Sequence, residues 1–205
     1  NKMFAYIKGN LEVKTNGYVV IDVNGIGYKI FMSETAINKL GAIGEIIKIH
    51  TYVRVREDDI SIYGFNTNEE LRMFELLLSV SGIGAKSALV ILSNVSVSSF
   101  ALAIINNDVN LLKKLPGIGP KTAQRVILEL KDKLKKENEI VANEDREVSD
   151  TIKAAIIDDE KIAEATAALK VLGYTGKEIE KALEKVDANL SVEDIIRKGL
   201  LNLAR

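Results

Sequence analysis

The first 65 residues alternate apolar and polar positions with the period of two that half-buried β-strands show. Apolar runs such as "YVVIDV" and "IGYKIFM" are separated by Asn24-Gly25, and Asn-Gly between apolar runs is a strong hairpin signal. A short helix is predicted over "ETAINKL", with Ser33 as its N-cap, and two further strands follow in "EIIKIHTYVRV" and "ISIYGF". This pattern favours a small closed β-barrel of the OB type over residues 1–66.

The periodicity becomes helical in the next third of the chain, residues 67–138. The segment "NEELRMFELLLSV" begins with a capping residue and two acids, and Leu71, Phe74 and Leu78 repeat at helical spacing. Further helices are predicted up to about Lys136. The fold class is therefore α+β and multidomain, with a β-barrel followed by an all-α domain.

The last third divides into a polar stretch and a second helical unit. The stretch over residues 139–157 is acid-rich and aperiodic, so we expect a flexible linker there. Residues 158–205 predict three short helices that break at Gly173-Tyr174-Thr175-Gly176 and at Asn189. A three-helix, UBA-like bundle on a tether is expected. Its apolar side chains are predicted to form the core, or a docking surface for a partner if they are exposed: Leu172, Tyr174, Ile179 and Leu183.

One short pattern occurs twice in the middle third, as "SGIGAKSALVIL" at 81–92 and "PGIGPKTAQRVI" at 116–127. Both copies share Gly-Ile-Gly, a lysine two residues later, a hydroxyl residue and then alanine. Two glycines allow a tight turn and a close approach of the backbone to a ligand, while the isoleucine between them can anchor the turn in the core. These turns with the residues after them are the candidate phosphate-binding site: Gly82, Ile83, Gly84, Lys86, Ser87, Gly117, Ile118, Gly119, Lys121 and Thr122.

The chemistry of the repeated pattern suits a phosphate. A helix N-terminus presents free backbone N–H groups and a partial positive charge, and Lys86 and Lys121 add a point charge to each site. Contacts of this kind position a duplex without reading its sequence, and two copies could grip both strands across one minor groove. A single Gly-x-Gly turn often only joins two helices, but the duplication favours binding. Neither copy has the glycine directly before lysine of a nucleotide-binding loop, so no nucleotide hydrolysis is expected.

The distribution of charge and the amino-acid composition indicate where a polyanion could bind and exclude several kinds of functional site. The net charge of −1 hides a gradient, since residues 67–138 carry 10 basic and 7 acidic side chains, whereas residues 139–205 carry 10 and 15. With no cysteine in the sequence, disulfides, thiolate metal sites and cysteine nucleophiles are excluded. Neither a signal segment nor an apolar run of membrane-spanning length is found, so we expect a cytoplasmic protein that does not associate with a membrane. The single histidine, His50, lies in a strand pattern and is expected to be structural.

Three consecutive acids, Glu57, Asp58 and Asp59, are predicted at the tip of the hairpin "YVRVREDDISIYGF". One alternative is a structure-selective nuclease in which they hold Mg²⁺, but two-metal chemistry needs carboxylates from several chain positions. Another alternative is a single-strand or RNA-binding OB protein, which needs aromatic stacking platforms beside a basic groove. Few aromatics are present, and most fit core positions. A third interpretation is that Glu57 and Asp58 form an acidic pin that repels DNA, with Asp59 as a turn residue.

A family resemblance rests on five segments in combination: "VRED", "YGF", "GIGAKSALVIL", "LPGIGPKTAQRVILELKDKL" and "ALKVLGY". With these segments the chain closely resembles the RuvA family over nearly its whole length. Paired helix-hairpin-helix units occur in other DNA-binding proteins, but not with this barrel before them and this bundle after. Pro120 departs from the family, since relatives often carry a second lysine there, and Asn1-Lys2 precede the methionine at which family members usually start.

The resemblance implies a function for each part. A homotetramer, alone or as two face-to-face tetramers in an octamer, would hold four-way junction DNA open in a sequence-independent manner. The C-terminal bundle would recruit the hexameric ATPase RuvB for branch migration in recombination and repair, and the resolvase RuvC would be a further partner. The family role is non-catalytic and implies no cofactor and no metal.

Overall fold

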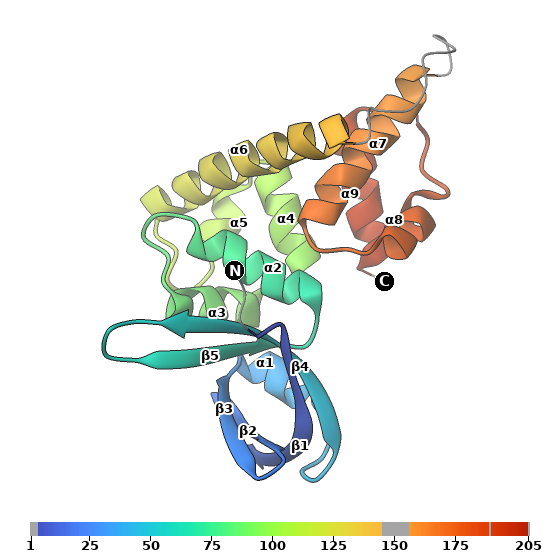
Figure 1. Cartoon of the computed structure of the whole chain (residues 1–205). Coiled ribbons are helices and arrows are strands. Elements are labelled where there is room, and N and C mark those ends of the chain that lie inside the picture. Colours follow the sequence, from blue (N-terminus) through green and yellow to red (C-terminus); the bar gives the residue numbers. More distant parts are fainter. Residues whose placement is uncertain (1–3, 145–155, 189, 205) are drawn as a thin grey trace.

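The computed structural model describes residues 4–144, 156–188 and 190–204, with side chains left undescribed at 132, 134–144 and 156–160. Within this part of the chain, five strands and a short helix form the N-terminal unit (Figure 1). Their bounds are β1 Tyr6–Lys14, β2 Tyr18–Val23, β3 Ile26–Phe31, α1 Glu34–Asn38, β4 Ile46–Val55 and β5 Ile60–Phe65. The strands close in the order β1-β2-β3-β5-β4, with β3 and β5 parallel and the other neighbours antiparallel. The predicted OB-type barrel is confirmed.

Alternation along the strands produces the barrel core. Leu11, Ile21 and Ile30 point inward and are fully buried, while their sequence neighbours face outward. The β2–β3 hairpin turns at Asn24 and Gly25, which have φ of 54° and 86°, the positive values that a two-residue type I′ turn requires. The predicted cap of α1 is also present, since the Ser33 hydroxyl accepts from the backbone N–H of residue 36 at 3.1 Å.

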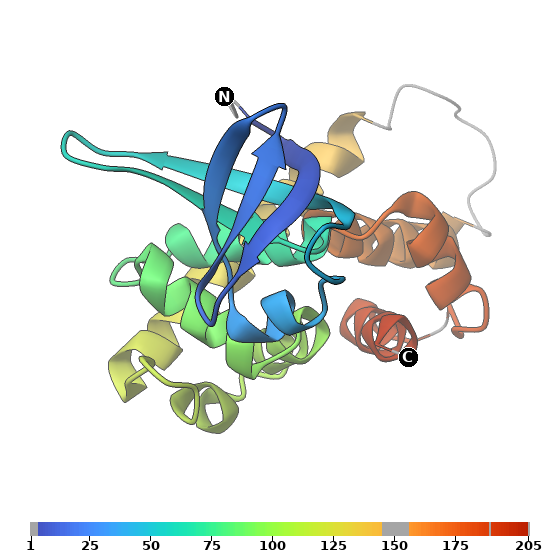
Figure 2. The ribbon, with the colours of Figure 1, turned by 90° about the horizontal axis from the view of Figure 1, so that it is seen from below.

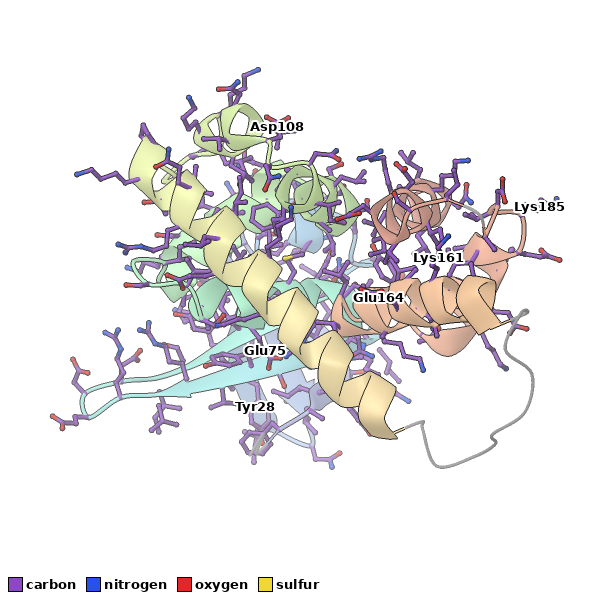
Figure 3. The ribbon with its side chains drawn as sticks, turned by 90° about the horizontal axis from the view of Figure 1, so that it is seen from above. Tyr28, Glu75, Asp108, Lys161, Glu164 and Lys185 are labelled. Carbon is purple, nitrogen blue, oxygen red and sulfur yellow. The ribbon has the colours of Figure 1, made fainter. Side chains whose placement is uncertain are left out.

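The central domain consists of helices around one apolar core. Their bounds are α2 Asn68–Leu78, α3 Ala85–Asn94, α4 Val97–Ile105, α5 Val109–Lys113 and α6 Pro120–Glu144. Phe74 of α2 and Phe100 of α4 are completely buried in this core. The cap of α2 is Thr67, one residue before the predicted start, because its hydroxyl accepts from the N–H of Glu70. Seen from above, α6 runs across the domain, with Glu75 of α2 below it (Figure 3).

The expected linker differs from the structure at both ends. Helix α6 continues to Glu144, and the next helix begins at Ile156, so 139–144 and 156–157 are helical and not extended. No glycine or proline interrupts α6 after Pro120, and its sequence consists largely of good helix formers, which favours propagation of the helix. Residues 145–155, the rest of the expected linker, lie outside the described residues.

The C-terminal unit consists of α7 Ile156–Val171, α8 Gly176–Leu183 and α9 Val192–Leu203, which confirms the predicted three-helix bundle. Helix α8 starts with a capping box in which Thr175 and Glu178 exchange side-chain to backbone hydrogen bonds. In Figures 1 and 3 the bundle lies at one side of the central domain, with α7 beside α6.

The bundle does not stand apart on a tether but packs against the central domain. One continuous apolar cluster contains residues of both units, such as Phe100 and Leu200. Arg72 of α2 donates from Nε to the carbonyl of Val171 at 3.1 Å. Gly173 has φ of +100°, and a Cβ there would lie 2.8 Å from the Cα of a residue in α2, so both the turn and the contact require glycine.

In the described residues, no single helix is both long and apolar enough to span a bilayer. Helices α3 and α4 meet this test only as a pair, and they are bent by 97° at their junction. Both helices contribute fully buried residues to the central core, for example Ile91 and Ala101.

Candidate nucleic-acid interface

The first repeated turn, Ser81-Gly82-Ile83-Gly84, joins α2 to α3. Gly82 has φ of +93°, a conformation that a residue with a Cβ rarely adopts. Ile83 is only 7% exposed and donates its N–H to the carbonyl of Val80 at 3.1 Å, so it anchors the turn in the core. Gly84 is the N-cap of α3 and provides no side-chain cap. The first N–H groups of α3 are therefore left for water or for an external acceptor such as phosphate.

The second repeated turn, before α6, has the same geometry. Gly117 has φ of +83°, and Ile118 is 5% exposed and donates to the carbonyl of Leu115 at 3.1 Å. The N–H of residue 123 donates to the carbonyl of Gly119 at 2.9 Å, as the corresponding alanine does to Gly84 in the first turn. Pro120 starts α6 and has no N–H, so the second site has one donor fewer than the first.

The side chains predicted to accompany the turns lie at the starts of the two helices. Lys86 and Lys121 are exposed, while Ser87 and Thr122 are half-buried. Both turns are open at the glycine that precedes the helix, since a Cβ at Gly84 or at its counterpart in the second turn would meet nothing within 4 Å, whereas a Cβ at Gly82 would meet Nη1 of Arg125 at 3.9 Å. Each turn thus combines an open backbone surface, a helix N-terminus and a cationic side chain.

The acidic hairpin tip lies on the same side of the molecule as the two turns. The β4–β5 hairpin extends well beyond the barrel, as Figure 2 shows, and Figure 1 shows its tip on the side where α3 and α6 begin. Glu57 and Asp58 are exposed at this tip. Asp59 differs, because its carboxylate accepts from the Ser61 hydroxyl and its carbonyl accepts from the N–H of Arg56 at 2.8 Å. Asp59 is thus held within the turn, whereas the other two acids face solvent.

Two observations in the described residues bear on the alternative functions. No group of three or more acidic or histidine side chains in this part of the chain could hold a metal ion. Aromatic rings gather at the junction of barrel and helices, where Tyr52, Tyr63 and Phe65 pack around Phe74 with centroids 4.8 to 5.4 Å apart. These rings fill a core and do not form an exposed platform for bases.

His50 is half-buried in β4. Burial lowers the pKa of its imidazole, and the nearby charge of Lys48 acts in the same direction. The charge of Glu69 acts in the opposite direction, and no second histidine is present in the sequence.

The apolar residues considered as a docking surface for a partner are mainly part of the bundle core. Leu172, Ile179 and Leu183 are at most 7% exposed, so they are not available to a partner in this structure. Tyr174 is half-buried against the start of α2, and burial together with the charges of Glu69 and Glu178 raises its pKa to about 12. Apolar residues at helical spacing can form either the core of a small bundle or an exposed docking surface, so their spacing alone does not distinguish the two.

Sequence reasoning missed a groove between α8 and α9. Its volume is about 520 Å³, and Leu201, which is 51% exposed, lies in it. Its lining is mostly charged: Lys181, Glu184, Lys185, Val186, Lys198, Leu201 and Asn202. The pair Leu200-Leu201 gives no clear signal in the sequence, because two adjacent leucines on a helix can both be buried in one core, as Leu76 and Leu77 of α2 are.

Comparisons with known proteins cover all three units. The RuvA N-terminal domain model matches residues 3–64, the SAM-like helix-hairpin-helix tandem model matches residues 74–132, and the RuvA C-terminal domain model matches residues 160–204. Three relatives are named "Holliday junction branch migration complex subunit RuvA". The protein of Acetivibrio thermocellus is 50% identical over 204 residues, that of Clostridium perfringens 46% over 203, and that of Ruminiclostridium cellulolyticum 43% over 207. These alignments cover 98% or 99% of this chain and 100% of each relative. The chain therefore belongs to the RuvA family.

Proposed function

We propose that this protein is a non-catalytic Holliday-junction-binding subunit of a branch migration complex that acts in recombination and repair. The observation that carries the proposal is the pair of turns before α3 and α6, each with a positive-φ glycine, a buried isoleucine and an uncovered helix start. The names of relatives that align over their full length support the same function. The units would be the barrel with its pin at 1–66, the DNA-binding domain at 67–138, the linker region at 139–157 and the bundle at 158–205.

The two turns would hold one duplex arm through its phosphates. Backbone N–H groups at residues 84 to 87, and at residues 119, 121 and 122 in the second turn, would donate to phosphate oxygens, and Lys86 and Lys121 would add positive charge. None of these groups reads base edges, so binding would be independent of sequence. Because one pair of turns suits one duplex, a junction with four arms calls for four copies in a closed ring.

Glu57 and Asp58 would act at the crossover point of the junction. Four hairpin tips near the centre of a ring would place eight exposed carboxylates opposite the phosphates. Two like charges 4 Å apart repel by about 1 kcal/mol in water and by more where water is excluded. The tips would therefore keep strands apart at the crossover and disfavour ordinary duplex across the same face.

The C-terminal bundle would recruit and position RuvB, which supplies the ATP-dependent work. The groove between α8 and α9 is the part of the bundle suited to this contact, because three lysines surround the exposed side chain of Leu201. This lining fits a segment of the motor that carries both acidic and apolar side chains. RuvC would act on the same junction, held open by the ring.

A labelled four-way junction separates the candidate functions. Purified protein should bind the junction in Mg²⁺ without cutting it, and strands should exchange only after RuvB and ATP are added. Incision by this protein alone that is lost in Glu57→Gln would support the nuclease instead. Tight binding to poly-dT without any preference for branched DNA would support a single-strand binder.

A further inference from the structure

Helix α6 carries a row of three charged residues that faces the first turn. Arg125, Glu129 and Lys133 are spaced by four and therefore lie on one side of the helix. Their polar contacts reach residue 81, which immediately precedes Gly82, and residue 79, two positions earlier. The second turn is directly continuous with the start of the same helix. Thus α6 contacts the first turn through side chains and the second through its backbone.

Ser81 is held by two side chains of α6. Arg125 donates from Nη1 to the Ser81 carbonyl at 3.2 Å and to its hydroxyl at 3.3 Å. The Ser81 N–H donates to Oε2 of Glu129 at 3.3 Å, and Glu129 Oε1 lies 3.8 Å from Nε of Arg125. Lys133 donates to the carbonyl of Ser79 at 3.3 Å. Both backbone polar groups of Ser81 and its side chain are therefore engaged by a helix more than 40 residues away in sequence.

The two repeated turns differ in this respect. Pro116 occupies the position in the second turn that Ser81 has in the first, and proline has neither an N–H nor a hydroxyl. The second turn needs no such contact, because its helix is α6 itself. The first turn precedes the shorter α3, so the contacts with α6 fix its position relative to the second turn.

We infer that Arg125 and Glu129 are positioning residues that set the separation and orientation of the two phosphate-binding turns. The inference rests on the proposed function, since it concerns how the two sites fit one duplex at once. A duplex presents phosphates at fixed spacing, and a first turn that moves freely would have to be ordered when DNA binds.

Variants of Glu129 can distinguish a positioning role of this residue from a purely electrostatic effect on DNA binding. A carboxylate near a phosphate site repels DNA, so its removal should tighten binding if charge alone matters. If Glu129 positions the first turn, Glu129→Ala should instead weaken junction binding, by about three- to tenfold, as expected when one hydrogen bond and the geometry it fixes are removed. Glu129→Gln, which keeps an acceptor for the Ser81 N–H, should bind at least as tightly as the wild type. Arg125→Lys keeps the charge but replaces the planar guanidinium, whose Nη1 makes both contacts with Ser81, by a shorter and less directional ammonium group, and it should also weaken binding.

The experiment compares these variants with Leu128→Ala, which truncates the neighbouring exposed side chain on the same helix. Junction affinity is measured at fixed salt, together with thermal unfolding and amide hydrogen exchange at residues 82–84 and 117–119. We expect faster exchange in the first turn only, and an unchanged affinity for Leu128→Ala. Tighter binding by Glu129→Ala, or weakening by Leu128→Ala to the same degree, would overturn the inference. Failure of the wild type to bind the junction would instead contradict the proposed function.

Discussion

Neutralising the two exposed acids of the β4–β5 hairpin tip should strengthen binding to plain duplex DNA. Glu57 and Asp58 are exposed, so each would interact with a nearby phosphate largely through water, where a charge pair at 4 Å is worth about 1 kcal/mol. Replacing both with their amides removes two such repulsions in each copy that contacts the duplex. The gain is about 2 kcal/mol for one copy, which corresponds to roughly a 30-fold tighter Kd.

The assay measures the affinity of Glu57→Gln/Asp58→Asn for a linear duplex and for a four-way junction of the same arm sequence. The duplex should gain more than the junction, so the preference for junctions should fall. Because these repulsions are screened by salt, the gain should shrink as ionic strength rises. Asp59→Asn is the matched control, since its carboxylate is held by Ser61 within the turn. An unchanged duplex affinity in the double variant, or an equal gain in the control, would refute the role of the tip.

Three further predictions concern the turns and the bundle. Lys86→Ala and Lys121→Ala should each lower the affinity for DNA of any sequence by the same factor. Each should also reduce the slope of log K against log salt by about 0.9 for every phosphate that the lysine neutralises. An unchanged slope would mean that the lysine does not bind a phosphate. Gly117→Ala places a Cβ at φ of +83° and should reduce the free energy of unfolding by about 1 to 2 kcal/mol in urea denaturation; full stability would show that the turn can relax. Burial raises the pKa of Tyr174 to about 12, so the folded state keeps a proton that the unfolded state loses near pH 10. Stability should therefore be intact below pH 10 and fall between pH 10 and 12, and a comparison of the wild type with Tyr174→Phe at pH 8 and 11 should show a smaller loss in the variant.

Local patterns predict the elements of this fold well. Period-two alternation with Asn24-Gly25 is sufficient to predict hairpins of a barrel, because both the apolar face and the positive φ are local requirements. The same is true of the two repeated turns, where Gly82 and Gly117 have the left-handed conformation that only glycine adopts easily.

Contacts between distant parts of the chain could not be predicted in this way. The apolar side chains of the bundle have the same helical period whether they face their own core, the central domain or solvent, so the packing of the bundle on the central domain has no local signal. The contact between Arg125 and Ser81 joins residues 44 apart and depends on how α6 crosses the domain. The sequence pattern underestimates the length of α6 because an acidic, polar composition suits both a linker and an exposed helix.

The most direct test of the account is the native mass of the protein bound to an intact four-way junction in Mg²⁺. We predict complexes of four chains, or of eight if two rings face each other, on one uncut junction, and no complex of comparable stability on a linear duplex. One or two chains per DNA, equal binding to the linear duplex, or cleaved strands in the complex would contradict the account.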